Sequence, residues 1–166
     1  MALNKLKFNS LNVTPTAGKT VGFNSSADGL EATLSGGAMT FIKKLTASSS
    51  SSLTFTNGSS DVVLDSTYKE YMFVYQDIHP SANGPNFQVQ FNAGGSAATK
   101  TTTSFYAYHN EGDTSTQLTY QASYDLAQST GAQTIATDVT NENDSSAAGY
   151  VHLFNPSSTT FVKHFI

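Results

Sequence analysis

Short alternating runs of apolar and polar residues, separated by turn residues, most limit what this chain can fold into. The run Phe87-Gln88-Val89-Gln90-Phe91 alternates without a break, so its apolar side chains share one face of a strand and its glutamines the other. Turn residues lie on both sides of it, at 81–85 and at 92–95. No segment indicates a helix with comparable clarity. The pattern therefore predicts an all-β protein made of short strands.

The longest strand is predicted from Tyr68 to His79, and Pro80 ends it by removing a backbone donor. We expect this strand to be covered on both sides, because both of its faces are apolar. Its faces carry Met72, Val74 and Ile78 on one side and Tyr71, Phe73 and Tyr75 on the other.

Further strands are expected at 38–47, at 105–108 and in a closing pair, 150–154 and 160–166. The closing pair forms a hairpin across Asn155-Pro156-Ser157-Ser158. Many short strands of this kind favour an antiparallel β-sandwich or jelly roll, with an extended N-terminal arm before it.

Two segments are compatible with more than one structure. Residues 117–126 alternate like a strand, yet the stretch from Asp125 to Gln128 would tolerate a helical turn. The five serines at 48–52 are typical of a flexible connector, or they extend the preceding strand through Leu53 and Phe55.

The chain is expected to have three parts. Residues 1–37 form an arm too poor in large apolar side chains to fold alone, 38–61 a strand and serine-rich connector, and 62–166 the sandwich. The tripeptide Phe8-Asn9-Ser10 recurs as Phe23-Asn24-Ser25. Short repeats of this kind occur in fibrous β shafts, and coincidence is the alternative explanation. The chain stops inside its last predicted strand, so we expect either a continuation past Ile166 or a strand that docks on a neighbouring subunit.

The composition argues against several classes of partner. The net charge is −4 and all eight basic residues are lysine, so the arginine forks that read bases and clamp phosphates are absent and no nucleic acid is expected. The chain contains no cysteine, which excludes disulfides and thiolate chemistry. No apolar run has the length of a membrane span, so no membrane insertion is expected.

Candidate catalytic and metal-binding groups are sparse. The four histidines lack the spacing of a zinc site. His109, Glu111 and Asp113 would share one face of a strand and could hold a cation, but Gly112 and the threonines after it indicate a polar loop tip. We therefore predict no catalytic residue, no metal and no cofactor.

Tyrosines are the better candidates for function, because their flat rings suit both protein interfaces and stacking on sugars. The alternative is that each ring fills the rim of the core and keeps its hydroxyl in water. The candidate glycan or subunit contacts are Tyr71, Tyr75, Tyr106 and Tyr108, and the candidates for anchoring the arm are Phe8 and Phe23.

Three segments resemble, in the same order, virion structural proteins of marine tailed bacteriophages, including phages of cyanobacteria. They are Ser66-Thr67-Tyr68-Lys69-Glu70-Tyr71-Met72-Phe73-Val74 with its continuation Asp77-Ile78-His79-Pro80-Ser81, then Tyr106-Ala107-Tyr108-His109-Asn110-Glu111, and then residues 152–165. The resemblance extends from about residue 62 to the end of the chain.

This resemblance implies a non-enzymatic virion protein, in a tail fibre, a baseplate or the decoration of the head. Its expected partners are other capsid or tail proteins, further copies of itself, most simply as a homotrimer, and a host surface glycan. Alternatives are a free carbohydrate-binding module, or a hydrolase of surface polysaccharide, which would need two carboxylates about 5 to 10 Å apart in a cleft.

Overall fold

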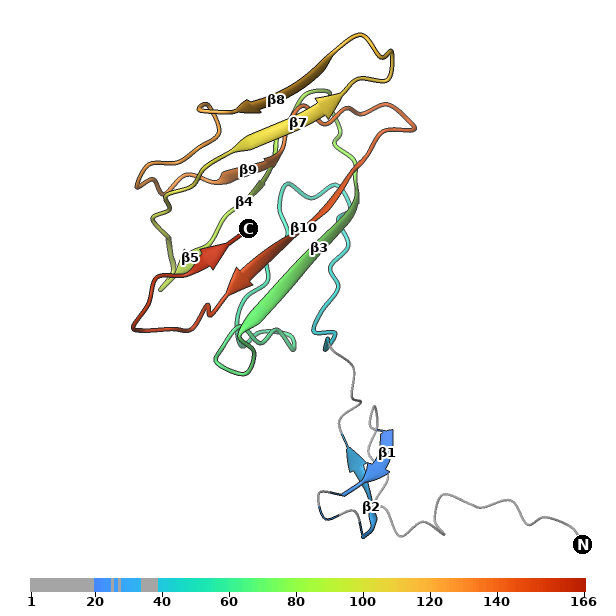
Figure 1. Ribbon diagram of the computed structural model, residues 1–166, viewed down its shortest axis with the longest axis vertical. Coiled ribbons are helices and arrows are strands. Elements are labelled where there is room, and N and C mark those ends of the chain that lie inside the picture. Colours follow the sequence, from blue (N-terminus) through green and yellow to red (C-terminus); the bar gives the residue numbers. More distant parts are fainter. Residues whose placement is uncertain (1–19, 25, 27, 34–38) are drawn as a thin grey trace, which may run out of the picture. The chain divides into compact units, whose positions relative to one another are not determined.

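The computed structural model describes residues 20–24, 26, 28–33 and 39–166 (Figure 1). The chain divides into two compact units, with the division between Leu45 and Thr46. In the described part all regular structure is β, and every strand pair is antiparallel. The prediction of an all-β, antiparallel protein is confirmed. The strands form one sheet of three strands and four sheets of two.

The first unit contains a hairpin of β1 (Thr20–Phe23) and β2 (Leu30–Thr33). Asn24 closes it, because its side-chain oxygen accepts hydrogen bonds from the backbone N–H groups of Asp28 and Gly29 at 3.2 and 3.3 Å. The sequence predicts an extended arm here and does not predict this hairpin. Phe23 lies opposite Leu30 and is 75% exposed, whereas Phe8 lies outside the described residues.

The prediction of a strand at 38–47 is wrong, because residues 39–47 pair with no other segment. Met39 and Phe41 are instead 74% and 80% exposed. A strand needs a partner for its backbone groups, and alternation of side chains does not supply one. The serines at 48–52 and the residues after them form a loop, so they do not extend a strand through Leu53 and Phe55.

The three-stranded sheet has the order β11–β10–β3, and β3 (Glu70–Ile78) and β10 (Ala147–Phe154) run side by side along their length (Figure 1). The predicted closing hairpin forms, but its second strand is shorter than the predicted 160–166, because only β11 (His164–Phe165) pairs with the end of β10 as a strand. β3 is the predicted long strand, and it ends before Pro80 as expected.

One face of this sheet holds most of the core. Tyr71, Val151 and Leu153 are buried there, at 4%, 5% and 8% exposure. Gly149 lies opposite Tyr75, and a Cβ added to Gly149 would lie 2.4 Å from the Tyr75 hydroxyl oxygen. The tyrosine ring therefore occupies the space that any side chain at Gly149 would need.

The expectation that β3 is covered on both sides is wrong for this chain. Met72 and Val74 point to the other face and are 42% and 56% exposed. Ile78 does not share their face, because β3 has an extra residue opposite β10, with Asp77 in a left-handed conformation (φ 52°). Ile78 is half-buried and lines a hollow together with Phe87.

A second sheet pairs β4 (Phe87–Val89) with β9 (Gln133–Ala136), a strand that the sequence did not predict. The predicted alternation of β4 is confirmed, since its apolar side chains are half-buried and Gln88 is exposed. Next comes a small hairpin of β5 (Asn92–Ala93) and β6 (Ser96–Ala97). Gly94 and Gly95 both have positive φ, as a tight two-residue hairpin turn requires.

The last sheet is the hairpin of β7 (Phe105–His109) and β8 (Thr116–Tyr120). It settles the ambiguity at 117–126: the chain is a strand as far as Tyr120 and then turns, with a hydrogen bond from the Tyr124 N–H to the Gln121 carbonyl oxygen.

Two polar side chains are buried in the second unit. Lys100 hydrogen-bonds Gln90 and the Ala98 carbonyl oxygen, and burial lowers its pKa. Gln133 donates to the carbonyl oxygens of Tyr124 and Thr134 and accepts a hydrogen bond from the Thr102 hydroxyl. Every buried side-chain polar atom in the described residues has a partner, as a stable interior requires.

Candidate functional site

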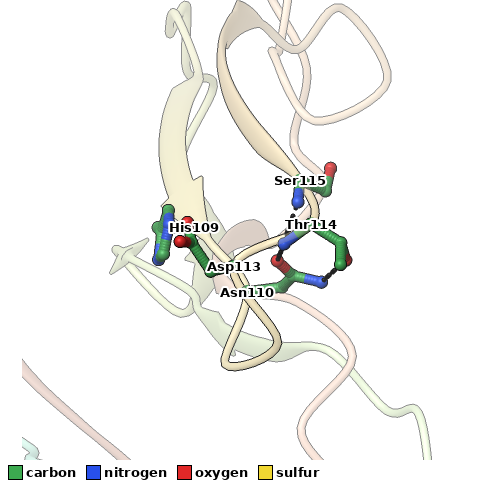
Figure 2. Close-up of polar contacts among 5 residues, drawn as sticks. All are labelled: His109, Asn110, Asp113, Thr114 and Ser115. Carbon is green, nitrogen blue, oxygen red and sulfur yellow. Dashed lines mark hydrogen bonds and ion pairs between the residues drawn. The ribbon is translucent and has the colours of Figure 1, made fainter.

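The tip of the β7–β8 hairpin is held by one asparagine (Figure 2). The side-chain oxygen of Asn110 accepts hydrogen bonds from the backbone N–H groups of Thr114 and Ser115 at 2.9 and 2.8 Å. Its side-chain nitrogen donates to the Thr114 hydroxyl at 2.8 Å. Asparagine is common in such turns, because its side chain forms the hydrogen bonds that a backbone group would otherwise form. The tip is therefore an ordered polar loop, as its sequence predicts.

The sequence offers three residues as possible ligands for a cation, and two of them lie close together at this tip. The His109 Nε2 lies 2.7 Å from an Asp113 carboxylate oxygen, and Figure 2 shows the two side chains side by side. Their side chains are 55% and 87% exposed, so water screens the pair. Glu111 forms no hydrogen bond or ion pair with either of them. Within residues 39–166 and the described part of the first unit, no group of three or more His, Asp or Glu side chains is placed to hold a metal ion.

Tyr106 and Tyr108 lie on one face of β7, and their rings stack with centroids 5.8 Å apart and planes inclined by 30°. Tyr108 is 44% exposed, and its hydroxyl lies 3.1 Å from the Ser115 hydroxyl. Tyr106 is half-buried. These two rings form a stacked aromatic pair beside the polar tip. Such a pair can stack on a sugar or on a protein side chain.

The opposite face of the same hairpin is apolar and open to solvent. Phe105 and Leu118 are 73% and 77% exposed. Tyr120, directly opposite Phe105, is 55% exposed and donates a hydrogen bond to Asp125, which raises the pKa of the tyrosine. We call Phe105, Leu118 and Tyr120 the hairpin face.

The other two tyrosine candidates lie inside the subunit. Tyr71 is buried and donates a hydrogen bond to the Asp65 carbonyl oxygen at 3.1 Å, and burial raises its pKa. Tyr75 is half-buried against Phe87, with ring centroids 4.9 Å apart. Neither ring forms a surface on which a glycan could stack, so a contact role is kept only for Tyr106 and Tyr108.

A polar hollow of about 270 Å³ lies where β3 ends. Asp77, His79 and Asp144 line it together with Asn143, Ser145 and Ser146. His79 is already engaged, because its Nε2 lies 3.0 Å from the Glu142 carbonyl oxygen. The hollow is wide open to solvent and holds no set of ligands for a cation within the described chain.

The largest feature that sequence reasoning missed is the outward face of the three-stranded sheet. Alternation along paired strands places Glu70 and His164 there, together with six apolar or aromatic side chains: Met72, Val74, Tyr150, His152, Phe154 and Ile166. Tyr150 and Ile166 are 62% and 82% exposed. The His152 ring packs against the rings of Tyr150 and Phe154, and the His152 side chain also contacts Glu70. We call these six residues the outer sheet face. The alternating run Tyr150-Val151-His152-Leu153-Phe154 signals two apolar faces, but not which one stays open.

Comparison with known protein families, with curated proteins and with solved structures found no match to this chain. Among the described residues, no helix has the length and apolar character needed to cross a membrane.

Proposed function

We propose that this chain is a non-enzymatic structural protein of a tailed-bacteriophage virion, in a tail fibre, a baseplate or the decoration of the head. In this role, its first unit anchors the subunit and its second unit contacts other subunits or the host surface. The resemblance of three segments beyond residue 62 to virion proteins favours this class over other β proteins.

The main observation in favour of this proposal is that many more large apolar side chains are exposed than buried. In the described chain only five apolar residues are buried: Val62, Tyr71, Val139, Val151 and Leu153. Seventeen large apolar residues are at least 37% exposed, among them both the hairpin face and most of the outer sheet face. Soluble monomers seldom leave contiguous patches of this kind open, and interfaces between subunits use them.

A sandwich or jelly roll is the architecture that we propose for the second unit. Two aromatic contacts support it. Tyr75 of β3 packs against Phe87 of β4, and Phe165 of β11 packs against Phe91, with ring centroids 4.9 and 4.8 Å apart. The core face of the three-stranded sheet is thus joined to the β4 segment at two points, as two facing layers would be.

A homotrimer is the proposed form of the subunit, and its virion partners cover the rest of the exposed apolar surface. Mass spectrometry of purified phage particles tests this function directly. We expect the chain to be present in particles that have been washed free of host protein. Its absence from the particle, with the protein found only in the host lysate, would refute the proposal.

Carbohydrate binding is a second candidate function, favoured by the stacked Tyr106 and Tyr108 rings beside a polar loop. A glycan array with the soluble full chain tests it. Tyr108→Ala should abolish binding, whereas Tyr150→Ala removes a still more exposed tyrosine from a different surface and should leave binding intact. Equal signals from both variants would remove this function.

A further inference from the structure

The two edges of β3 are distinguished by the directions of the backbone groups in the three-stranded sheet. In β10, His152 exchanges both backbone hydrogen bonds with Ile166, so its N–H and C=O groups face β11. These groups alternate in direction along an antiparallel strand. The backbone groups of Val151 and Leu153, on either side of His152, therefore face β3.

This alternation fixes which residues of β3 have unpaired backbone groups. Phe73 and Tyr71 lie opposite these two residues of β10, so their backbone groups bond to β10. Met72 lies between them, so its N–H and C=O groups face away from β10, and so do those of Val74. In the part of the chain that the structure describes, no backbone group pairs with them.

This free edge lacks the usual protection. Proteins normally block such an edge with charges, proline or a bulge. The stretch Tyr71 to Tyr75 contains neither a charge nor a proline, and the bulge at Asp77 comes only after it. The side chains of Met72 and Val74 are also exposed, at 42% and 56%. The edge is therefore suited to an added strand with apolar residues at alternate positions.

The β3 strand of a second copy is a strand of this kind. In an antiparallel register centred on Phe73, the stretch 71–75 of one copy lies opposite the same stretch of the other. Met72 then lies opposite Val74 of the second copy, and the two residues exchange backbone hydrogen bonds. Their side chains meet on the outer sheet face, where neighbours across two strands stabilise a sheet. The pairing is self-complementary, because a twofold axis repeats each contact.

The charges at the ends of the stretch suit this register. Counted outward from Phe73, Glu70 falls opposite Gln76 of the second copy, and Lys69 falls near Asp77 of that copy. The lysine and the aspartate thus meet as opposite charges at both ends of the pairing. A register shifted toward either end would place a charged residue opposite an apolar or aromatic one, which favours the register centred on Phe73.

We propose that β3 pairs with β3 of a second copy in this register, and that the pairing joins neighbouring trimers in the assembled particle. The contact uses backbone groups in the plane of the sheet, so it leaves the outer sheet face available to copies within the same trimer. It deepens the proposed function, on which its role in a particle rests. In dilute solution the contact is weak, because each chain has a net charge of −4 and a single pair of strands is only marginally stable.

Hydrogen exchange of the full chain, followed residue by residue by NMR at increasing protein concentration, tests this contact. At the highest concentration the amides of Met72 and Val74 should exchange about tenfold more slowly than in dilute solution, because the added strand accepts their hydrogen bonds. The amides of Tyr71 and Phe73 should keep their rates, because β10 already accepts theirs. Exchange at Met72 and Val74 that does not depend on concentration would overturn the inference.

A proline variant separates this pairing from other contacts between copies. Val74→Pro removes one donor from the free edge and no hydrogen bond to β10. It should abolish the slowing at Met72, whereas Val74→Thr keeps the donor and should retain the slowing. An unchanged exchange rate at Val151 shows that the proline variant is folded. Equal slowing at Met72 in the two variants would contradict the pairing.

Two charge variants test the register without a proline. Lys69→Glu brings like charges together at both ends of the pairing and should prevent the slowing at Met72. Lys69→Glu/Asp77→Lys brings opposite charges together again and should restore it. Equal behaviour of the two variants would overturn the proposed register. Absence of the chain from the virion would refute the proposed function and leave this contact standing.

Discussion

The three-stranded sheet and the β7–β8 hairpin have similar compositions and different environments. Both are antiparallel and rich in tyrosine and phenylalanine. The sheet buries one face, with Tyr71, Val151 and Leu153 all under 9% exposed. The hairpin buries no side chain to that extent, and only Tyr106 and Thr119 are even half-buried.

The difference shows that aromatic strands in this protein serve two purposes. In the sheet, the aromatic residues of the buried face stabilise the subunit through contacts such as that between Tyr75 and Phe87. In the hairpin and on the outer sheet face they remain available for contact. Local sequence does not separate the two cases, because the distinction depends on which strands lie opposite. Comparable substitutions in the two regions should therefore have very different costs.

The largest contrast is expected between two leucines. Leu153→Ala removes a buried side chain from the core and should lower the free energy of unfolding by about 2 to 4 kcal/mol. Leu118→Ala removes a side chain that is 77% exposed and should cost less than about 0.5 kcal/mol. Chemical denaturation of the full chain, followed by circular dichroism, measures both values. Equal costs would mean that the hairpin face is covered in the isolated protein.

Two glycines provide the next contrast. Gly149→Ala places a Cβ 2.4 Å from the Tyr75 hydroxyl oxygen and should cost about 1 to 3 kcal/mol, because the ring must leave its contact with Phe87. In Gly112→Ala the new Cβ meets nothing closer than 3.9 Å, so little change is expected. Thermal unfolding of both variants measures the difference. A neutral Gly149→Ala would show that the Tyr75 ring moves without penalty.

A smaller effect is expected at the hairpin tip. Asn110→Ala removes the acceptor of two backbone hydrogen bonds and should cost about 1 kcal/mol. The loss should be local, so the amides of Thr114 and Ser115 should exchange faster while those of β10 keep their rates. Thr114→Val is the control, since it removes only the side-chain contact. Faster exchange throughout the second unit would contradict the separation of the two regions.

The smallest expected effect is a loss of folding stability at alkaline pH, to which Tyr71 contributes. Burial raises the pKa of Tyr71 above 10.0, its ordinary value, so the folded state holds this proton more tightly than the unfolded state. The stabilisation is complete below pH 10 and is lost as the pH rises through the folded pKa. Tyr71→Phe should weaken the decline in stability above pH 10, whereas Tyr108→Phe should not. Urea titrations at pH 8 and above measure it, and parallel declines in all three proteins would assign the effect elsewhere.

Much of the strand pattern could be predicted from local sequence. Alternation located β3, β4, β7 and β10, and Pro80 and the Asn155-Pro156 turn located the ends of β3 and β10. The segment 39–47 shows where this reasoning stops, because Met39 and Phe41 alternate like strand residues and find no partner strand. The bulge at Asp77 is a second example, since one inserted residue moved Ile78 to the opposite face.

The candidate site was predictable only in part. The composition of residues 110–115 indicated a polar tip, which the structure confirms. The burial of Tyr71 and the exposure of Tyr108 could not be separated, because both lie in alternating aromatic strands. The outer sheet face could not be predicted either, because it depends on the register of β3 with β10, and these two strands are far apart in the chain.

The central proposal is that the outer sheet face of this protein is covered by further copies of the chain. Light scattering of the purified full chain, coupled to size-exclusion chromatography, tests it most directly. The account predicts a mass three times the 17.6 kDa of one chain, and dissociation of that species by Tyr150→Lys. A monodisperse species of 17.6 kDa at all concentrations would contradict it.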